Sequence, residues 1–294
     1  MTTTPSNLPG ARGVFFCLAL AACDDPGPAS GPLVRDGAPL PMRWSELESQ
    51  LTPETFSPRF PLWTDGLDKH RTLSRPRPNA APDEVGSIFT KTFSDGDRPL
   101  ETRVLVRRED GWELAAYLWD RDGDDAVLLD GEQPTPVPDS THVVPSQRQC
   151  RTCHESAPSP ILGYNDVQLG RAPLIPGVAD SELPRVKRDA IGWVLGNCTH
   201  CHNGGDGPSS VFDLRPAAFE AATLCVETTS SMSAPGLRIA PGAPDDSVLY
   251  RAVSRQDGTA SMPPLGVHRP DPHGLAALHA YITSLTPNCQ GAPR

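Results

Sequence analysis

Short runs of β-branched and aromatic residues, separated by Asp-Gly pairs, dominate the chain between residues 88 and 129. Runs of this kind, bounded by turn residues, are typical of antiparallel strands. The Asp110-Gly111 pair separates ETRVLVRR from WELAAYLW and predicts a β-hairpin. We therefore expect a small antiparallel sheet within residues 40–140, with strands at 88–93, 102–107, 112–119 and 126–129.

Helical spacing replaces this pattern in the last third of the chain. Apolar residues from Val186 to Cys198 recur every three or four positions, which predicts a helix. A terminal helix is expected after Asp271, whose side chain can cap it, with Pro272 at the first helical position and an apolar stripe that ends at Leu285.

Two smaller features concern how these helices begin and pack. Ser45 followed by Glu48 has the pattern of a capping box and predicts a short helix from Ser45 to Leu51. Gly192 and Gly196 lie one turn apart, so the terminal helix is expected to approach them closely with Tyr281 above them, although glycines can also simply be tolerated there.

These patterns predict an α+β protein in which a β-rich N-terminal domain precedes a mostly α-helical domain. The composition changes near Pro184, so the β-rich domain is expected at residues 40–185 and the helical domain at residues 186–294. Residues 23–39 are rich in Pro, Gly and acidic side chains and predict a flexible linker.

The N-terminus has the pattern of an export signal. One charge, Arg12, precedes an apolar run from Val14 to Ala22 that is too short to span a bilayer as a helix. Cys23 follows two alanines, as in bacterial lipoproteins, which predicts that residues 1–22 are removed and that Cys23 is lipidated. An ordinary cleavable signal, with the triplet at 19–21 recognised, is the alternative, and both predict export.

Two pentapeptides match the pattern C-x-x-C-H, CRTCH at 150–154 and CTHCH at 198–202. This is the attachment pattern of c-type haem, because two thiols can bond the two vinyl groups of one haem while the adjacent histidine binds its iron. In bacteria this attachment takes place outside the cytoplasm, which agrees with the export signal. We predict two covalently bound haem c groups, with thioether bonds at Cys150, Cys153, Cys198 and Cys201 and iron ligands His154 and His202.

A zinc site is the alternative for these motifs, since the two C-x-x-C pairs could supply four thiolates to one metal ion. A zinc site has no need of a histidine directly after each second cysteine, and an exported protein is a less common place for it. Haem is therefore favoured.

The chain has eight cysteines, and two remain after the signal (Cys17), the lipid site (Cys23) and the haem motifs are assigned. These two, Cys225 and Cys289, predict a disulfide in an oxidising compartment. Two unpaired cysteines are the alternative, because the sequence does not give the distance between their Cα atoms.

The sixth iron ligand has a clear candidate in only one of the two sites. Met262 lies in SMPPLG, after His202 and before the terminal helix, and His/Met ligation raises the potential and suits electron transfer. The alternative is a packing methionine. For the first haem, the sixth ligand stays open between His142, His70, another side chain or none.

Net charge restricts the partners. Removing residues 1–22 leaves 25 basic against 36 acidic residues, a net charge of −11. Nucleic acid and anionic lipid headgroups are poor partners for such a chain, whereas a redox donor or acceptor with a basic docking patch is favoured. The expected contact with a membrane is the lipid anchor.

Several sequence blocks, spread over most of Phe60 to Leu285, carry a resemblance. They are FPLWTDGLDKHR, KTF, ETRVLVRREDGWELAAYLWD, PSQRQCRTCH, LGYNDVQLGR, NCTHCHNGG, IAPGAPDDSVLYR and SMPPLG. In these blocks the chain resembles a family of bacterial diheme c-type cytochromes, with a β-rich N-terminal half before a cytochrome c domain. The resemblance implies the same two haem sites, Met262 as the distal ligand of the second, and cysteines placed as Cys225 and Cys289 are.

We thus expect an exported, lipid-anchored diheme cytochrome on the periplasmic side. It would carry electrons between a dehydrogenase or quinol-oxidising complex and an acceptor, and would not be an enzyme. The alternative is a diheme peroxidase or related haem oxidase with an open first haem. The motifs begin only 48 residues apart, which is short for two full cytochrome domains, and no acid–base pair accompanies the first motif.

Overall fold

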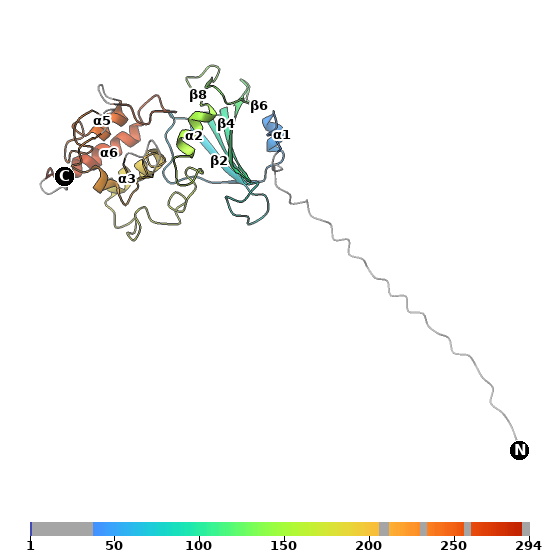
Figure 1. The fold of residues 1–294 in the computed structure, drawn as a ribbon, viewed down its shortest axis with the longest axis horizontal. Helices are drawn as coiled ribbons and strands as arrows, with labels where there is room; N and C mark the ends of the chain where they lie inside the picture. Colours follow the sequence, from blue (N-terminus) through green and yellow to red (C-terminus); the bar gives the residue numbers. More distant parts are fainter. Residues whose placement is uncertain (2–37, 206–211, 230–233, 256–259, 290–294) are drawn as a thin grey trace. The chain divides into compact units, whose positions relative to one another are not determined.

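The computed structural model describes Met1 and residues 38–205, 212–229, 234–255 and 260–289 (Figure 1). The expected signal peptide at 1–22, the expected lipid site Cys23 and most of the expected linker lie outside these residues. No helix among the described residues is long and apolar enough to cross a membrane.

A six-stranded antiparallel sheet forms from the first half of the described chain (Figure 1). Each strand pairs with the strand that precedes it in sequence, so the order in space is the order along the chain. The strands are β1 (Pro53–Thr55), β2 (Asp68–Ser74), β3 (Ile88–Asp95), β4 (Arg98–Arg108), β5 (Gly111–Trp119) and β6 (Ala126–Leu128), and a separate pair is β7 (Thr135–Pro136) with β8 (Val143–Val144).

The four strands expected from the sequence are confirmed as β3 to β6, and β1 and β2 are additional. β4 and β5 form the expected hairpin. Arg108 pairs with Gly111, so Glu109 and Asp110 form its tip, one residue earlier than the Asp-Gly pair suggests.

Both faces of the sheet pack against other parts of the chain. Side chains of neighbouring strand residues point to opposite sides, so each face has its own cluster. One face packs against α1 (Trp44–Glu48), through Ile88, Val104, Val106, Tyr117, Trp44 and Leu47. The other face packs against the chain around the first C-x-x-C-H motif, through Leu73, Phe89, Leu105, Leu114, Ile161 and Cys150.

The start of α1 differs from the expected capping box. The N-cap is Arg43, and no side chain caps the helix. Ser45 lies inside the helix, where its backbone N and its Oγ each donate a hydrogen bond of 3.0 Å to the carboxylate of Asp125. The expectation of Ser45 as the cap is wrong because a partner 80 positions away binds its hydroxyl.

Among the described residues, five further helices complete the α+β fold, α2 (Gln147–His154), α3 (Arg185–Asn197), α4 (Phe219–Thr223), α5 (Val248–Ser254) and α6 (Pro272–Ser284). α3 and α6 are the two helices expected from helical spacing. Asp271 caps α6 as expected, because its carboxylate accepts a hydrogen bond from the backbone N of His273 at 2.9 Å.

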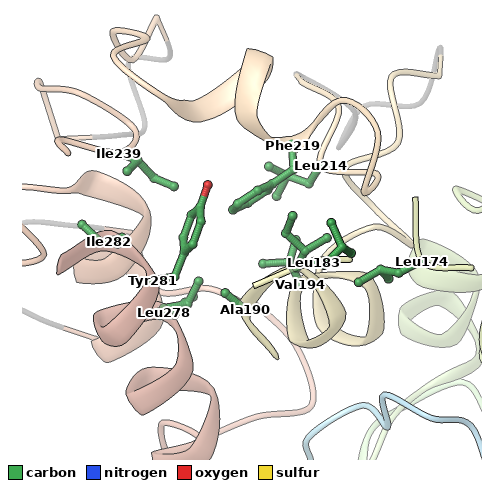
Figure 2. Close-up of a cluster of buried hydrophobic side chains, with 12 residues drawn as sticks. Leu174, Leu183, Ala190, Val194, Leu214, Phe219, Ile239, Leu278, Tyr281 and Ile282 are labelled. Atoms are coloured by element: carbon green, nitrogen blue, oxygen red, sulfur yellow. The ribbon is translucent and has the colours of Figure 1, made fainter. Parts of the chain in front are cut away.

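A second hydrophobic core lies where α3 and α6 pack together (Figure 2). Figure 2 shows Ala190 and Val194 of α3 near Leu278 and Tyr281 of α6, with Phe219 of α4 above them. This helical core is separate from the clusters on the sheet.

Residues 60–63, which precede the sheet strand β2, cover the two glycines of α3. A Cβ atom at Gly192 would overlap the ring of Phe60, and one at Gly196 would overlap the carbonyl of Phe60. The backbone N of Trp63 donates to the side chain of Asn197 at 2.8 Å. These contacts connect residues 40–185 to residues 186–294.

The expectation that α6 and Tyr281 cover these glycines is therefore wrong. α6 instead approaches α3 at Gly274, where a Cβ atom would overlap the indole of Trp193. The hydroxyl of Tyr281 points elsewhere and donates to Glu220 at 2.8 Å.

Cys225 and Cys289 form a disulfide, the pairing that the cysteine count predicts. Their Cα atoms are 5.5 Å apart, and the bridge joins the segment after α4 to the segment after α6. The cysteines are 64 positions apart, and closing a loop of this length in the unfolded chain stabilises the fold by about 4 kcal/mol.

Gly192→Ala is expected to lower the free energy of unfolding by about 1–3 kcal/mol, because the added methyl group overlaps the ring of Phe60. Urea unfolding of both proteins measures the change. In a Phe60→Ala background the ring is absent, so the same glycine change should cost much less. An equal cost in both backgrounds would contradict this packing.

Candidate functional site

The first C-x-x-C-H motif forms the last five residues of α2. Ser146 caps this helix, and its hydroxyl and the side chain of Gln149 form a reciprocal capping box. Cys150 and Cys153 are one turn apart and so lie on one side of the helix. α2 packs against β5, and Cys150 reaches the aromatic cluster on that face of the sheet.

His154, at the end of this motif, is oriented by a backbone carbonyl. Its Nδ1 lies 2.6 Å from the carbonyl oxygen of Pro160, which can only accept, so Nδ1 carries the proton and Nε2 is left for a metal. Burial, with the nearby charge of Lys91, lowers the pKa of His154 to about 4. At neutral pH the ring is therefore neutral, the form that binds metal.

The second motif begins where α3 ends. Cys198 is the C-cap of α3 and packs against the helical core, and its carbonyl accepts hydrogen bonds from the backbone N of Cys201 and of His202. The ring of His202 stacks on Phe212 with centroids 4.6 Å apart. Its Nδ1 is buried without a hydrogen-bond partner among the described residues, and burial lowers its pKa.

The two motifs meet in space, although they are far apart in sequence. The side-chain ligand atoms of Cys153, His200 and Cys201 all lie within 4.8 Å of one another. A hydrogen bond between the two thiols raises the pKa of Cys153 to about 12 and lowers that of Cys201. Nearby, the side chain of Asn203 donates to the carbonyl of Ser156 at 2.8 Å.

All four motif cysteines, Cys150, Cys153, Cys198 and Cys201, are partly buried, and the disulfide of the described chain uses none of them. The described residues bring together only one thiol of each motif, with a histidine from inside the second. This set differs from the four-thiolate zinc site that is the sequence alternative.

A cavity of about 270 Å³ borders the second motif, the segment that follows the first motif, and the sheet. Thr199 and His200 line it from the second motif, and residues 157–159 and 161–163 line it from the segment after the first. Arg71 of β2 and Lys91 of β3 line it from the sheet. Its volume is near the lower end of the range for ligand pockets, roughly 300–1,000 Å³.

The other candidate ligands have different surroundings. Met262 packs against the helical core, to which Cys198 also belongs, and its backbone N donates to the carbonyl of Ala252. His142 is buried, and its Nε2 forms a 2.7 Å hydrogen bond with Glu101. His70 is exposed on β2.

Together these observations fit c-type haem attachment at both motifs. Each motif has two cysteines followed by a histidine whose pKa is lowered by burial, and the Nε2 of His154 is left for iron. The residues that would hold the two groups are those of the two pentapeptides.

Sequence reasoning does not find His200, which the fold brings to Cys153 of the other motif, or Arg71 and Lys91, which line the cavity. His200 lies inside the pentapeptide CTHCH, so its position offers a local signal. Arg71 and Lys91 offer none, because isolated basic residues on strands are common surface residues.

No family model, curated protein or solved structure matches the chain.

A buried charge network lies beneath the first motif. The side chain of Glu101 is fully buried, forms a 2.5 Å ion pair with Arg103 and accepts the hydrogen bond of His142. Burial alone would raise the pKa of Glu101, but the charge of Arg103 and the hydrogen bonds of both partners hold it below its ordinary value.

Glu101→Gln is expected to lower the free energy of unfolding by about 3–5 kcal/mol at neutral pH, because it leaves the buried charge of Arg103 without its partner. The control is Glu54→Gln, which breaks the ion pair between Glu54 and Arg75. The side chain of Glu54 is 62% exposed. The control should change the free energy of unfolding by less than about 1 kcal/mol. Urea unfolding measures both variants.

The difference in the free energy of unfolding between wild type and Glu101→Gln is expected to depend on pH. Because the pKa of Glu101 is lowered in the folded state, its contribution is complete above the ordinary carboxyl pKa of about 4.3 and is lost as the pH falls through the lowered value. The difference between wild type and Glu101→Gln should therefore shrink below about pH 4. A constant difference from pH 7 to pH 3 would contradict an ionised Glu101.

Proposed function

We propose that this protein is an exported diheme c-type cytochrome that carries electrons between redox partners. The observation that supports this most is the meeting of the two C-x-x-C-H motifs, where the ligand atoms of Cys153, His200 and Cys201 lie within 4.8 Å of one another. Haem iron, when bound, supplies a one-electron couple. Because the attachment motifs are adjacent, the two proposed haems would lie next to each other, which would allow electron transfer between them.

The chain's own residues have three tasks in this proposal. The motif cysteines anchor the two groups, and His154 and His202 each provide a neutral imidazole as iron ligand. The hydrogen bond from His154 to Pro160 fixes the ring orientation. The hydrophobic cores on both sides of the motifs limit access of water, which affects the reduction potential.

The helical half is proposed to be a cytochrome c-like domain. α3 leads directly into the second motif and packs against the terminal helix α6, and Met262 belongs to the segment before that helix. In this proposal Met262 is the distal ligand of the second haem. The disulfide of Cys225 and Cys289 joins two segments of the same half and stabilises it.

The proposed location is the periplasmic side of a bacterial membrane, with a lipid anchor at Cys23. The basis is the sequence of residues 1–23, which lie outside the described residues apart from Met1. The proposed partners are redox proteins with a basic docking patch, since the chain without residues 1–22 has a net charge of −11.

The protein, produced in a host that exports it and attaches haem c, is expected to contain two haems per chain by pyridine haemochrome assay. Cys150→Ser/Cys153→Ser and Cys198→Ser/Cys201→Ser should each contain one, because each removes one attachment site. The control Cys225→Ser/Cys289→Ser removes the disulfide and should keep two. A wild-type protein that contains no haem but one zinc ion per chain would contradict the proposal.

Met262→Ala is expected to keep both haems but to lose the sulfur-to-iron charge-transfer band of the oxidised protein. The potential of one haem should fall, because a methionine ligand raises it. The control is Met42→Ala, since the side chain of Met42 is 61% exposed. An unchanged spectrum in Met262→Ala would contradict ligation by Met262.

Electron paramagnetic resonance of the oxidised protein separates this proposal from a peroxidase. Two low-spin haems are expected for electron transfer. A high-spin signal together with peroxide turnover would instead favour an open first haem.

A further inference from the structure

Three basic side chains lie side by side across the centre of the sheet. In the strand register, Arg71 of β2 pairs with Lys91 of β3, and Lys91 pairs with Arg103 of β4. Directly paired residues point to the same face, so the three cations form a row. Like charges directly opposite each other destabilise a sheet, so this row needs compensating negative charge.

Only one end of the row has a negative partner among the described residues. Arg103 forms the ion pair with Glu101. Arg71 is buried, and its guanidinium has a single long hydrogen bond of 3.4 Å, to the carbonyl of Lys69. The ammonium of Lys91 has no hydrogen bond or ion pair in the described chain and lies 5.5 Å from the ring centroid of Phe93.

Both uncompensated cations line the 270 Å³ cavity beside the motifs. The cavity also contains Arg215 and His200, and not one of its lining residues is Asp or Glu. In a chain with a net charge of −10, a cavity lined by cations without a carboxylate favours anionic ligands. Asn165 and Gln168 add side-chain amides that can donate hydrogen bonds.

Without a bound anion, repulsion between these cations and their desolvation lower the stability of the fold. Burial, with the charge of Arg71, lowers the pKa of Lys91 to about 7. The row lies near the first motif, because Cys150 packs against the cluster of Leu73, Phe89 and Leu105, which are each two residues from one of the three cations and on the same face of the sheet. An anionic group placed between Arg71 and Lys91 would remove the repulsion and the desolvation cost together.

We propose that Arg71 and Lys91 form a carboxylate-binding site for the two propionate groups of the haem attached at Cys150 and Cys153. This inference rests on the proposed function. Propionates are the charged side groups of haem, and a site with two cations next to the attachment helix matches two carboxylates in charge. Arg71 and Lys91 are thus binding and positioning residues, and they compensate the charge that would otherwise oppose reduction of the first haem.

Redox titration of the holoprotein tests the site, after the haem content of each protein is measured. Lys91→Gln is expected to lower one of the two reduction potentials, because an uncompensated propionate disfavours an added electron. We expect a change of at least tenfold in the equilibrium constant of that haem, which is about 59 mV for a one-electron couple. Arg71→Gln should lower the same potential, and Lys91→Arg, which keeps the charge, should leave it near the wild-type value.

Lys69→Gln is the matched control. Lys69 is a lysine of β2 that lies two residues from Arg71 and therefore on the same face, but its ammonium donates to the carbonyl of Leu67 and does not line the cavity. If Lys69→Gln lowers the potential as much as Lys91→Gln does, a general loss of positive charge explains the effect and the site is refuted.

Two further outcomes would overturn the assignment. If Lys91→Arg turns one low-spin haem into a high-spin haem, Lys91 is an iron ligand, since an arginine cannot replace a neutral amine there. If acetate added to the wild type shifts one potential saturably, and Lys91→Gln abolishes this shift, the cations bind a free carboxylate and not propionates. Unchanged potentials in Lys91→Gln and Arg71→Gln, with two haems bound, refute the site alone, whereas a wild type without haem refutes the proposed function.

Discussion

The close packing of residues 60–63 on α3 is the constraint on which the arrangement of both motifs depends. The ring and carbonyl of Phe60 occupy space that any side chain at Gly192 or Gly196 would fill, and Trp63 is hydrogen-bonded to Asn197. Backbone groups can approach a helix this closely only at residues that have no Cβ atom. The segment between β1 and β2 is thereby held against the helix that leads into the second motif.

Gln168 extends this constraint to the segment after the first motif. Its side-chain amide accepts a hydrogen bond from the backbone N of Phe60 and donates one to the carbonyl of the same residue. Phe60, Gln168 and Gly196 all line the cavity between the motifs and the sheet. The contacts that join the sheet to the helices therefore also shape the site, and the thiols of Cys153 and Cys201 meet as a consequence.

The electrostatics of the site reflect its position between two buried regions. On the sheet side, Glu101 compensates Arg103 but leaves Lys91 and Arg71 to face the cavity. On the motif side, the histidines are held neutral by burial. A neutral imidazole can bind a metal and an uncompensated cation can bind a negative charge, and the proposed haem would supply both.

Local patterns were sufficient for several elements. The strands β3 to β6 follow β-branched runs between turns, and α6 follows a capping Asp271 and a first-turn Pro272. Both are decided by interactions within a few residues. The capping box at Ser45 was wrong for the opposite reason, because the distant Asp125 binds that hydroxyl.

The sequence by itself determined that each C-x-x-C-H motif has two thiols and an imidazole within five consecutive residues, which predicts haem attachment. It also determined that Cys225 and Cys289 were left to pair. Only the tertiary structure decided that one motif lies beside the other, that Phe60 covers the glycines of α3, and that Arg71 and Lys91 face a cavity. These are contacts between residues far apart in sequence, and packing of the whole chain decides them, whereas local periodicity does not.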